Sequence, residues 1–149
     1  GANSSKTSYI SRNIVTKNAN LIDKYKVRIS ILVPQNGEAG VKPEKGYRSM
    51  STPHIVYPGQ VDSFSYLNIG FFDNEMEAEN FRKYMMCKLP RFMMRTTYSS
   101  AHISQSNFIF VPKMDYTRSW TDPDLYEYFG LSDGEIELIE STMRSMTDL

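Results

Sequence analysis

Polar side chains able to contact an anionic polymer gather in two stretches of this sequence. The first, residues 35–60, is interrupted by glycines and prolines, which is typical of a long functional loop. The second runs from residue 91 to residue 105. Arginine and lysine bind phosphates, while guanidinium and amide groups can also bind base edges. The candidate DNA-binding residues are Lys42, Lys45, Tyr47, Arg48, Arg91, Arg95 and Gln105. The alternative is that both stretches are simply solvated loops.

Catalytic patterns find little support in the sequence. The two histidines, His54 and His102, lie far apart, and there is no Gly-x-Ser-x-Gly elbow. The single cysteine, Cys87, follows two methionines in a predicted helix, which favours a buried, inert thiol. One cysteine and two histidines offer no metal-ligand spacing. We therefore expect no catalytic residue, no metal site and no cofactor in this chain.

A nuclease contribution is a second hypothesis. Pro123-Asp124 matches the first element of a magnesium-dependent nuclease motif, but no acidic-x-Lys element follows it. Under this alternative Asp122 or Asp124 would be needed for cleavage.

The formal net charge of zero hides strong segmentation. Lysine and arginine outnumber acidic residues nine to three in residues 1–50 and seven to one in residues 82–118. Acidic residues lead five to none in residues 51–81 and eight to one in residues 119–149. Two basic segments on one face would suit an anionic polymer, although solvated faces give the same pattern.

Length and composition indicate one domain over residues 1–149. No apolar run approaches the ~20 residues needed to span a bilayer, so we expect no membrane partner. The opening residues lack the pattern of a signal peptide, and one cysteine fits a reducing compartment. A cytoplasmic location is the expectation.

Hydrophobic periodicity predicts strands at residues 26–33, 54–57, 64–72 and 108–111, with a strand or extended arm at residues 9–14. In the first strand Val27, Ile29, Ile31 and Val33 share one face, and Lys26, Arg28, Ser30 and Leu32 share the other. The last strand should end at Pro112, which cannot donate a ladder hydrogen bond.

A long helix should begin after Asp73 or Asn74 and be kinked or broken at Pro90. Thr121 and the Ser132–Glu135 capping box predict closing helices over residues 121–147. The expected fold is therefore α+β (mixed α/β): a small twisted sheet, a long helix after the third strand and a helical C-terminal lid.

Three sequence blocks carry a family resemblance. They read Phe110-Val111-Pro112-x-x-Asp115, Trp120-Thr121-Asp122-x-x-Leu125-Tyr126-x-x-Phe129-Gly130-Leu131 and Glu135-Ile136-x-x-Ile139-Glu140. In this order they resemble the C-terminal end of large bacterial adenine-specific DNA methyltransferases of type II restriction–modification systems, including fused type IIG forms. The likeness extends over residues 9–147.

The resemblance implies a target-recognition domain, similar also to those of type I specificity subunits, which reads DNA while another domain transfers the methyl group. The chain would then be a C-terminal fragment of a larger methyltransferase. Its partners would be double-stranded DNA and the methyltransferase core of the same polypeptide. The parent would use S-adenosylmethionine, and magnesium if it also cuts DNA. The family's Asn/Asp-Pro-Pro-Tyr/Phe motif and glycine-rich cofactor motif are absent from this sequence, so methyl transfer is not expected of it.

The resemblance also implies a structural role for the Trp-Thr-Asp block. We expect Trp120, Asp122 and Tyr126 to latch the fold, with Trp120 as a core anchor. The sequence departs from the family after the Lys-Val strand, at residues 33–38, and before Tyr66, at residues 61–65. Different targets are read by different loops, so base contacts are expected in such variable stretches. A module that only packs on the methyltransferase core is the remaining alternative.

Overall fold

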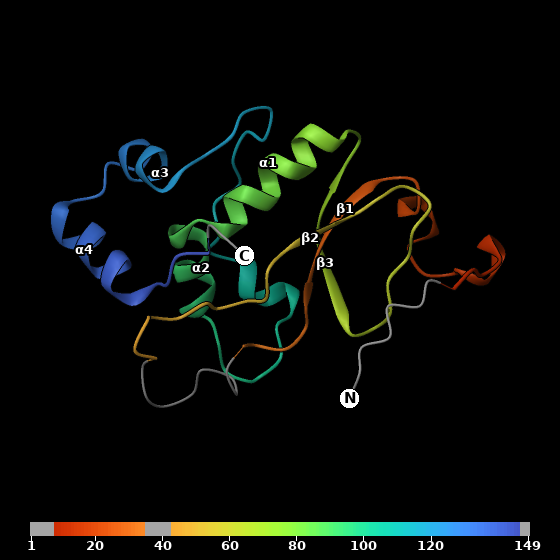
Figure 1. The fold of residues 1–149 in the computed structure, drawn as a ribbon, viewed down its shortest axis with the longest axis horizontal. Coiled ribbons are helices and arrows are strands. Elements are labelled where there is room, and N and C mark those ends of the chain that lie inside the picture. Colours follow the sequence, from red (N-terminus) through yellow and green to blue (C-terminus); the bar gives the residue numbers. More distant parts are fainter. Residues whose placement is uncertain (1–7, 35–42, 147–149) are drawn as a thin grey trace.

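A three-stranded antiparallel sheet organises the structure, a computed structural model that describes residues 8–34 and 43–146. The central strand β1 (Tyr25–Ser30) pairs with β2 (His54–Val56) on one side and with β3 (Tyr66–Phe72) on the other (Figure 1). With its helices, the chain is an α+β protein, as the sequence predicted. Among the described residues, no helix is both long and apolar enough to cross a bilayer.

The predicted alternation of β1 determines which side of the sheet is buried. Val27 and Ile29 are fully buried and belong to the main core. Arg28 pairs with Asn68 whereas Val27 pairs with Gly70, so Ile69 is an extra residue that makes a β-bulge in β3. Such a bulge bends the strand locally.

Two consecutive helices follow the sheet. Helix α1 (Glu75–Met86) starts at Asn74, whose side chain accepts a hydrogen bond from the Glu77 amide, and it contacts all three strands. Helix α2 (Lys88–Arg95) starts after Cys87. The predicted break is confirmed, but it occurs at Cys87, which places Pro90 in the first turn of α2. Proline is tolerated there because its missing amide has no intrahelical acceptor.

The predicted strand at residues 108–111 is wrong. Residues Gln105–Phe108 form a 3₁₀ helix, η4, followed by a turn in which Val111 N donates to Phe108 O at 3.0 Å. The Asn107 side chain explains this outcome, because it accepts from Ser104 N at 2.8 Å and donates to Thr97 O at 3.1 Å. Local side-chain bonds of this kind compete with strand ladders.

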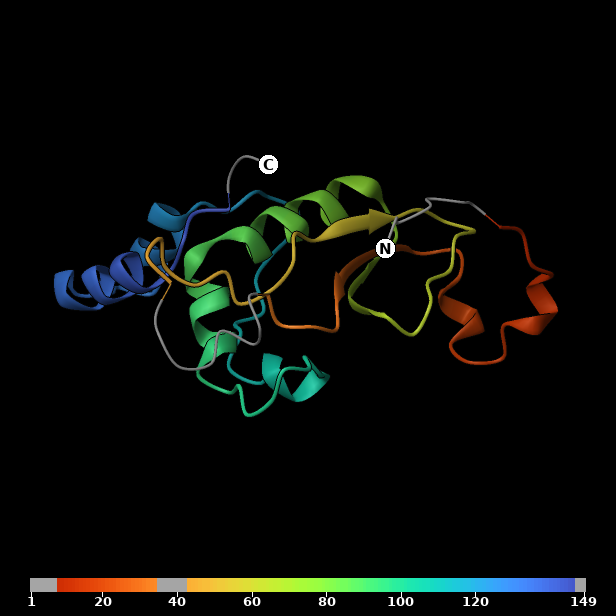
Figure 2. The ribbon, with the colours of Figure 1, turned by 60° about the horizontal axis from the view of Figure 1, so that its bottom comes forward.

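Residues 12–14 of the predicted strand or extended arm instead form a 3₁₀ turn, η1 (Arg12–Ile14), and a second 3₁₀ turn, η2 (Ala19–Leu21), precedes β1. These turns lie at one end of the molecule and the C-terminal helices at the other (Figure 2).

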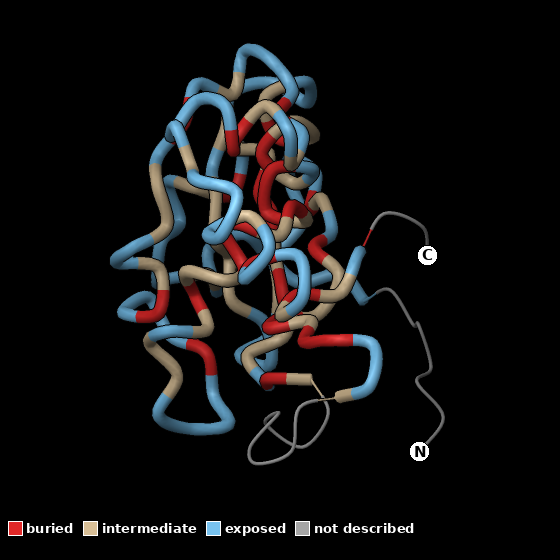
Figure 3. Tube along the Cα trace, turned by 90° about the vertical axis from the view of Figure 1, so that its left-hand side faces the viewer, coloured by how far each residue is buried: buried red, intermediate tan, exposed pale blue. Residues whose placement is uncertain are grey.

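The helical lid consists of α3 (Asp122–Tyr128) and α4 (Asp133–Thr142), each with the predicted capping residues. Ile139, Met143 and Met146 are buried, and α4 contacts α2. Buried residues run through the interior shared by the sheet and the helices (Figure 3).

Candidate nucleic-acid interface

The predicted DNA-binding residues do not form one surface. Lys42 lies outside the described residues, and Lys45 is exposed in a turn. Gln105 is exposed at the start of η4 and lies beside β3, where it lines two pockets. Tyr47, Arg48, Arg91 and Arg95 are brought together next to α2, but with very different exposures, as the following contacts show.

Arg91 is a structural residue. It is fully buried, and its Nε donates to the main-chain oxygens of Met86 and Cys87, both at 3.0 Å. Its Nη1 donates to Arg48 O at 3.1 Å and its Nη2 to Arg144 O at 2.7 Å. Arg91 therefore caps the end of α1 and ties two loops together, and its guanidinium has no surface to offer a phosphate.

Tyr47 is a buried anchor and not an exposed stacking ring. The Arg95 guanidinium lies 3.2 Å from the centroid of its ring, a cation–π contact. Tyr47 N donates to Thr142 O, and Arg144 N donates to Tyr47 O, both at 2.9 Å. The loop that precedes β2 is thereby joined to the segment that follows α4.

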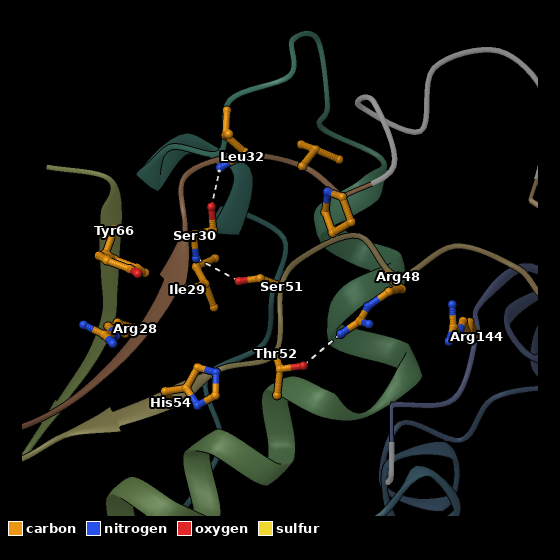
Figure 4. Close-up of a pocket in the computed structure, with 12 residues that line it drawn as sticks. Arg28, Ile29, Ser30, Leu32, Arg48, Ser51, Thr52, His54, Tyr66 and Arg144 are labelled. Atoms are coloured by element: carbon orange, nitrogen blue, oxygen red, sulfur yellow. Dashed lines mark hydrogen bonds between the residues drawn. The ribbon is translucent and has the colours of Figure 1, made fainter. Parts of the chain in front are cut away.

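A cleft of about 680 Å³ lies where β1, the loop before β2 and the segment after α4 meet (Figure 4). We call it the arginine cleft, because Arg28, Arg48 and Arg144 line it from these three parts of the chain. The other polar residues of its lining are Ser30, Ser51, Thr52, His54 and Tyr66. Hydroxyl, imidazole and guanidinium groups are all able to donate hydrogen bonds to a phosphate.

Arg28 is held in place by its neighbours. Its Nη1 forms an ion pair with the Asp62 carboxylate, whose side chain is only 4 % exposed, and its guanidinium carbon lies 4.1 Å from the centroid of the Tyr66 ring. Its Nε is buried and has no hydrogen-bond partner within the described part of the chain. Arg28 is thus oriented, while part of its donor capacity stays unused.

The other two arginines are fixed by different contacts. Arg48 Nη2 donates to Thr52 Oγ1 at 2.8 Å, and the main-chain oxygens of Arg48 and Arg144 both accept from Arg91. Among the described residues, no carboxylate lines the cleft, and Asp62 pairs with Arg28 from outside this lining. Three guanidinium groups thus lie at one cleft, and guanidinium groups can bind an anion such as a phosphate.

The surroundings of His54 lower the pKa of its imidazole. Burial, and then the charges of Arg28 and Arg82, hold the pKa of the His54 imidazole below its ordinary value of 6.5. The imidazole is therefore neutral at pH 7 and able to donate from one nitrogen and accept at the other.

Sequence reasoning missed Arg28, Arg144, His54 and Tyr66 as members of one site. One signal was present: Arg28, Ser30 and Leu32 were predicted to share a strand face, and all three line the cleft. Arg144 had no such signal, because it is the single cation of an acidic segment.

The three residues expected to latch the fold all make internal contacts. Trp120 is buried and its Nε1 donates to Asp115 O at 2.7 Å. Asp122 accepts from Lys88 N, the first amide of α2, at 2.6 Å. Tyr126 donates to Glu140 Oε1 at 2.7 Å, which connects α3 with α4.

The carboxylates of the nuclease alternative are engaged as helix caps. Asp122 caps α2, and Asp124 Oδ2 accepts from Thr121 N at 2.9 Å in the capping box of α3. Across residues 8–34 and 43–146, no group of three or more His, Cys, Asp or Glu is arranged to hold a metal ion. Comparisons with protein-family models, curated proteins and solved structures find no significant match to this chain.

Proposed function

We propose that this chain is a DNA target-recognition domain and that the arginine cleft receives the phosphate backbone of the duplex. The observation that carries the proposal is the convergence of Arg28, Arg48 and Arg144 on one cleft that no carboxylate of the described residues lines. The resemblance of the Trp120-Thr121-Asp122 block and its neighbours to type II restriction–modification methyltransferases supports the same reading.

Within this proposal the cleft positions the DNA and the adjoining loops read it. One guanidinium group can donate two parallel hydrogen bonds to the oxygens of a phosphate. Arg28 is already oriented by Asp62 and Tyr66, so its side chain has little conformational freedom to lose on binding. Phosphate contacts carry no sequence information, so specificity falls to neighbouring loops that include Lys45. In this proposal the methyltransferase core of the same polypeptide transfers the methyl group from S-adenosylmethionine.

The first experiment measures duplex binding by fluorescence anisotropy at several salt concentrations. The double variant Arg48→Gln/Arg144→Gln should bind at least about tenfold more weakly, and its salt dependence should fall by roughly one unit of slope for each lost phosphate contact. Arg118→Gln is the matched control, since Arg118 is exposed and lies against Trp120, away from the cleft. Equal binding by the double variant and the wild type would contradict the proposal.

The second experiment tests recognition itself. The domain is exchanged between two methyltransferases of different specificity, and the methylated sequence is mapped in each hybrid. The recognised sequence should move with the domain. If it stays with the core, the domain is a packing module, which is the alternative function.

A further inference from the structure

The outer edge of β3 is open in the part of the chain that the structure describes. β3 lies at one side of the sheet and pairs only with β1. From Ser63 to Phe72 the sequence has neither a charged residue nor a proline. Natural proteins usually protect such edges with lysine, proline or bulges, and here only the bulge at Ile69 is present. The regular part of this edge therefore precedes Ile69.

The register shows which peptide groups face outward. Ile31 N donates to Ser65 O at 3.2 Å, and Leu67 pairs with Ile29 two residues further along each strand. Antiparallel strands alternate, so the peptide groups of Leu67 point toward β1 and those of Asn68 point away from it. The Asn68 side-chain oxygen is also buried without a hydrogen-bond partner among the described residues. The outward main-chain N–H and C=O groups of Asn68 are thus available to pair with an added strand.

Two pockets flank this edge and share Leu67, Asn68, Phe71 and Gln105. The apolar pocket, of about 320 Å³, is closed by side chains of α1, of η4 and of the segment after η4, namely Phe81, Met85, Phe108, Val111 and Tyr116. The mixed pocket, of about 460 Å³, is closed by residues that precede β1 and β3, among them Val15, Lys17, Leu21, Asp62 and Phe64.

A strand added to β3 would use both pockets. Successive side chains of a strand point to opposite faces, so alternate residues would enter the apolar and the mixed pocket. Main-chain hydrogen bonds to an open edge combined with pockets for alternate side chains are the features of peptide recognition by strand addition.

Charge indicates what flanks such a segment. Lys113 lines the apolar pocket and Lys17 the mixed pocket, and neither forms an ion pair within the described residues. The other charges are already engaged, since Lys26 Nζ donates to Ile22 O at 3.0 Å and Asp62 pairs with Arg28. The remaining charges, those of Lys17 and Lys113, are positive on both sides of the edge and are complementary to carboxylates.

We propose that the open edge of β3 binds an extended segment of a partner protein. Alternate side chains of this segment enter the two pockets, and carboxylates flank the segment. The site is separate from the arginine cleft except for Tyr66, which lines both the cleft and the mixed pocket. It adds a protein-binding surface to the proposed DNA-binding domain and does not depend on DNA binding.

The probe is a fluorescein-labelled seven-residue peptide in which valine and threonine alternate between terminal aspartates, and binding is followed by anisotropy. The wild type should bind it at least about tenfold more tightly than the same peptide with terminal lysines. Asn68→Pro removes the outward amide while proline remains tolerated at an edge, so it should lose about tenfold or more. Asn68→Ala keeps that amide, so it should retain more of the binding than Asn68→Pro.

A charge reversal keeps the proposal testable even if the proline variant folds poorly. Lys113 is exposed, so Lys113→Glu should fold and should shift preference toward the lysine-ended peptide. Wild-type binding by a folded Asn68→Pro, or equal binding of both peptides, would overturn the proposal. Displacement of the peptide by duplex DNA would overturn it too. A dimer in sedimentation that Asn68→Pro abolishes would assign the edge to a second copy of this chain instead.

Discussion

Arg91 holds Arg48 in position: the buried Nη1 of Arg91 donates to the main-chain oxygen of Arg48 at 3.1 Å. The neighbouring Nη2 donates to the oxygen of Arg144 at 2.7 Å, so one interior side chain supports two arginines of the cleft. An arginine that does not reach the ligand thus contributes to the shape of the proposed DNA-binding site.

Replacing Arg91 by methionine should destabilise the protein by about 3 kcal/mol, because several buried carbonyls lose their donor. Urea unfolding measures the loss. Arg91→Lys should also be destabilising, since an ammonium cannot reproduce the planar fork that reaches Cys87 O, Arg48 O and Arg144 O. A loss smaller than about 1 kcal/mol for Arg91→Met would show that these bonds contribute little.

DNA binding should strengthen as the pH falls from 7 toward 5. The pKa of His54 lies below its ordinary value in the free protein, and a bound phosphate raises it, so binding takes up a proton. Affinity should rise by up to about tenfold for each unit by which binding raises this pKa. His54→Gln should remove the pH dependence in anisotropy titrations, whereas His102→Gln, outside the cleft, should keep it. Persistence of the full effect in His54→Gln would assign it to another group.

Replacing Trp120 by phenylalanine should lower the free energy of unfolding by about 1–3 kcal/mol without changing duplex affinity. The variant loses the hydrogen bond to Asp115 O and part of the edge contact with Tyr128, whose ring centroid lies 5.2 Å away. Thermal unfolding and anisotropy together test this. A stable variant with weaker DNA binding would instead identify Trp120 as a residue that stacks on bases.

Gly70 should tolerate no side chain. A Cβ built at this position would lie 2.5 Å from a ring carbon of Phe81, so Gly70→Ala should cost about 1–3 kcal/mol by forcing α1 away from β3. Gly134→Ala is the control, because nothing lies within 4 Å of its Cβ and the alanine favours helix α4. Calorimetry should show a lower Tm for the first variant and an equal or higher Tm for the second.

The elements that the sequence predicts well are those specified by neighbouring residues. The caps at Asn74, Thr121 and Ser132 depend on side chains that bond amides three residues ahead, so they can be read locally. The alternation of β1 likewise identifies Val27 and Ile29 as core residues. In contrast, residues 108–111 have strand-forming side chains, but a hydrogen-bond network around Asn107 stabilises a 3₁₀ helix and a turn instead.

The candidate site was much less predictable because it is made by long-range contacts. Arg28, Arg48 and Arg144 meet only after β1, the loop and the segment after α4 have packed together. Burial separates residues that look alike in sequence: Arg91 and Arg95 are four positions apart, yet Arg91 is buried and Arg95 lies on the Tyr47 ring. Whether the arginine cleft binds DNA stays a prediction.

The paired hydrogen bonds between Tyr47 and the main chain of Thr142 and Arg144 have a consequence for the order of folding. The sheet and α1 are complete in sequence at residue 86, but the cleft gains its third arginine only when residue 144 has been synthesised and the segment after α4 has packed on Tyr47. During translation the cleft would therefore lack Arg144 until the segment after α4 has packed. A chain stopped before residue 142 lacks Arg144 and is expected to bind a phosphate more weakly than the chain that includes it.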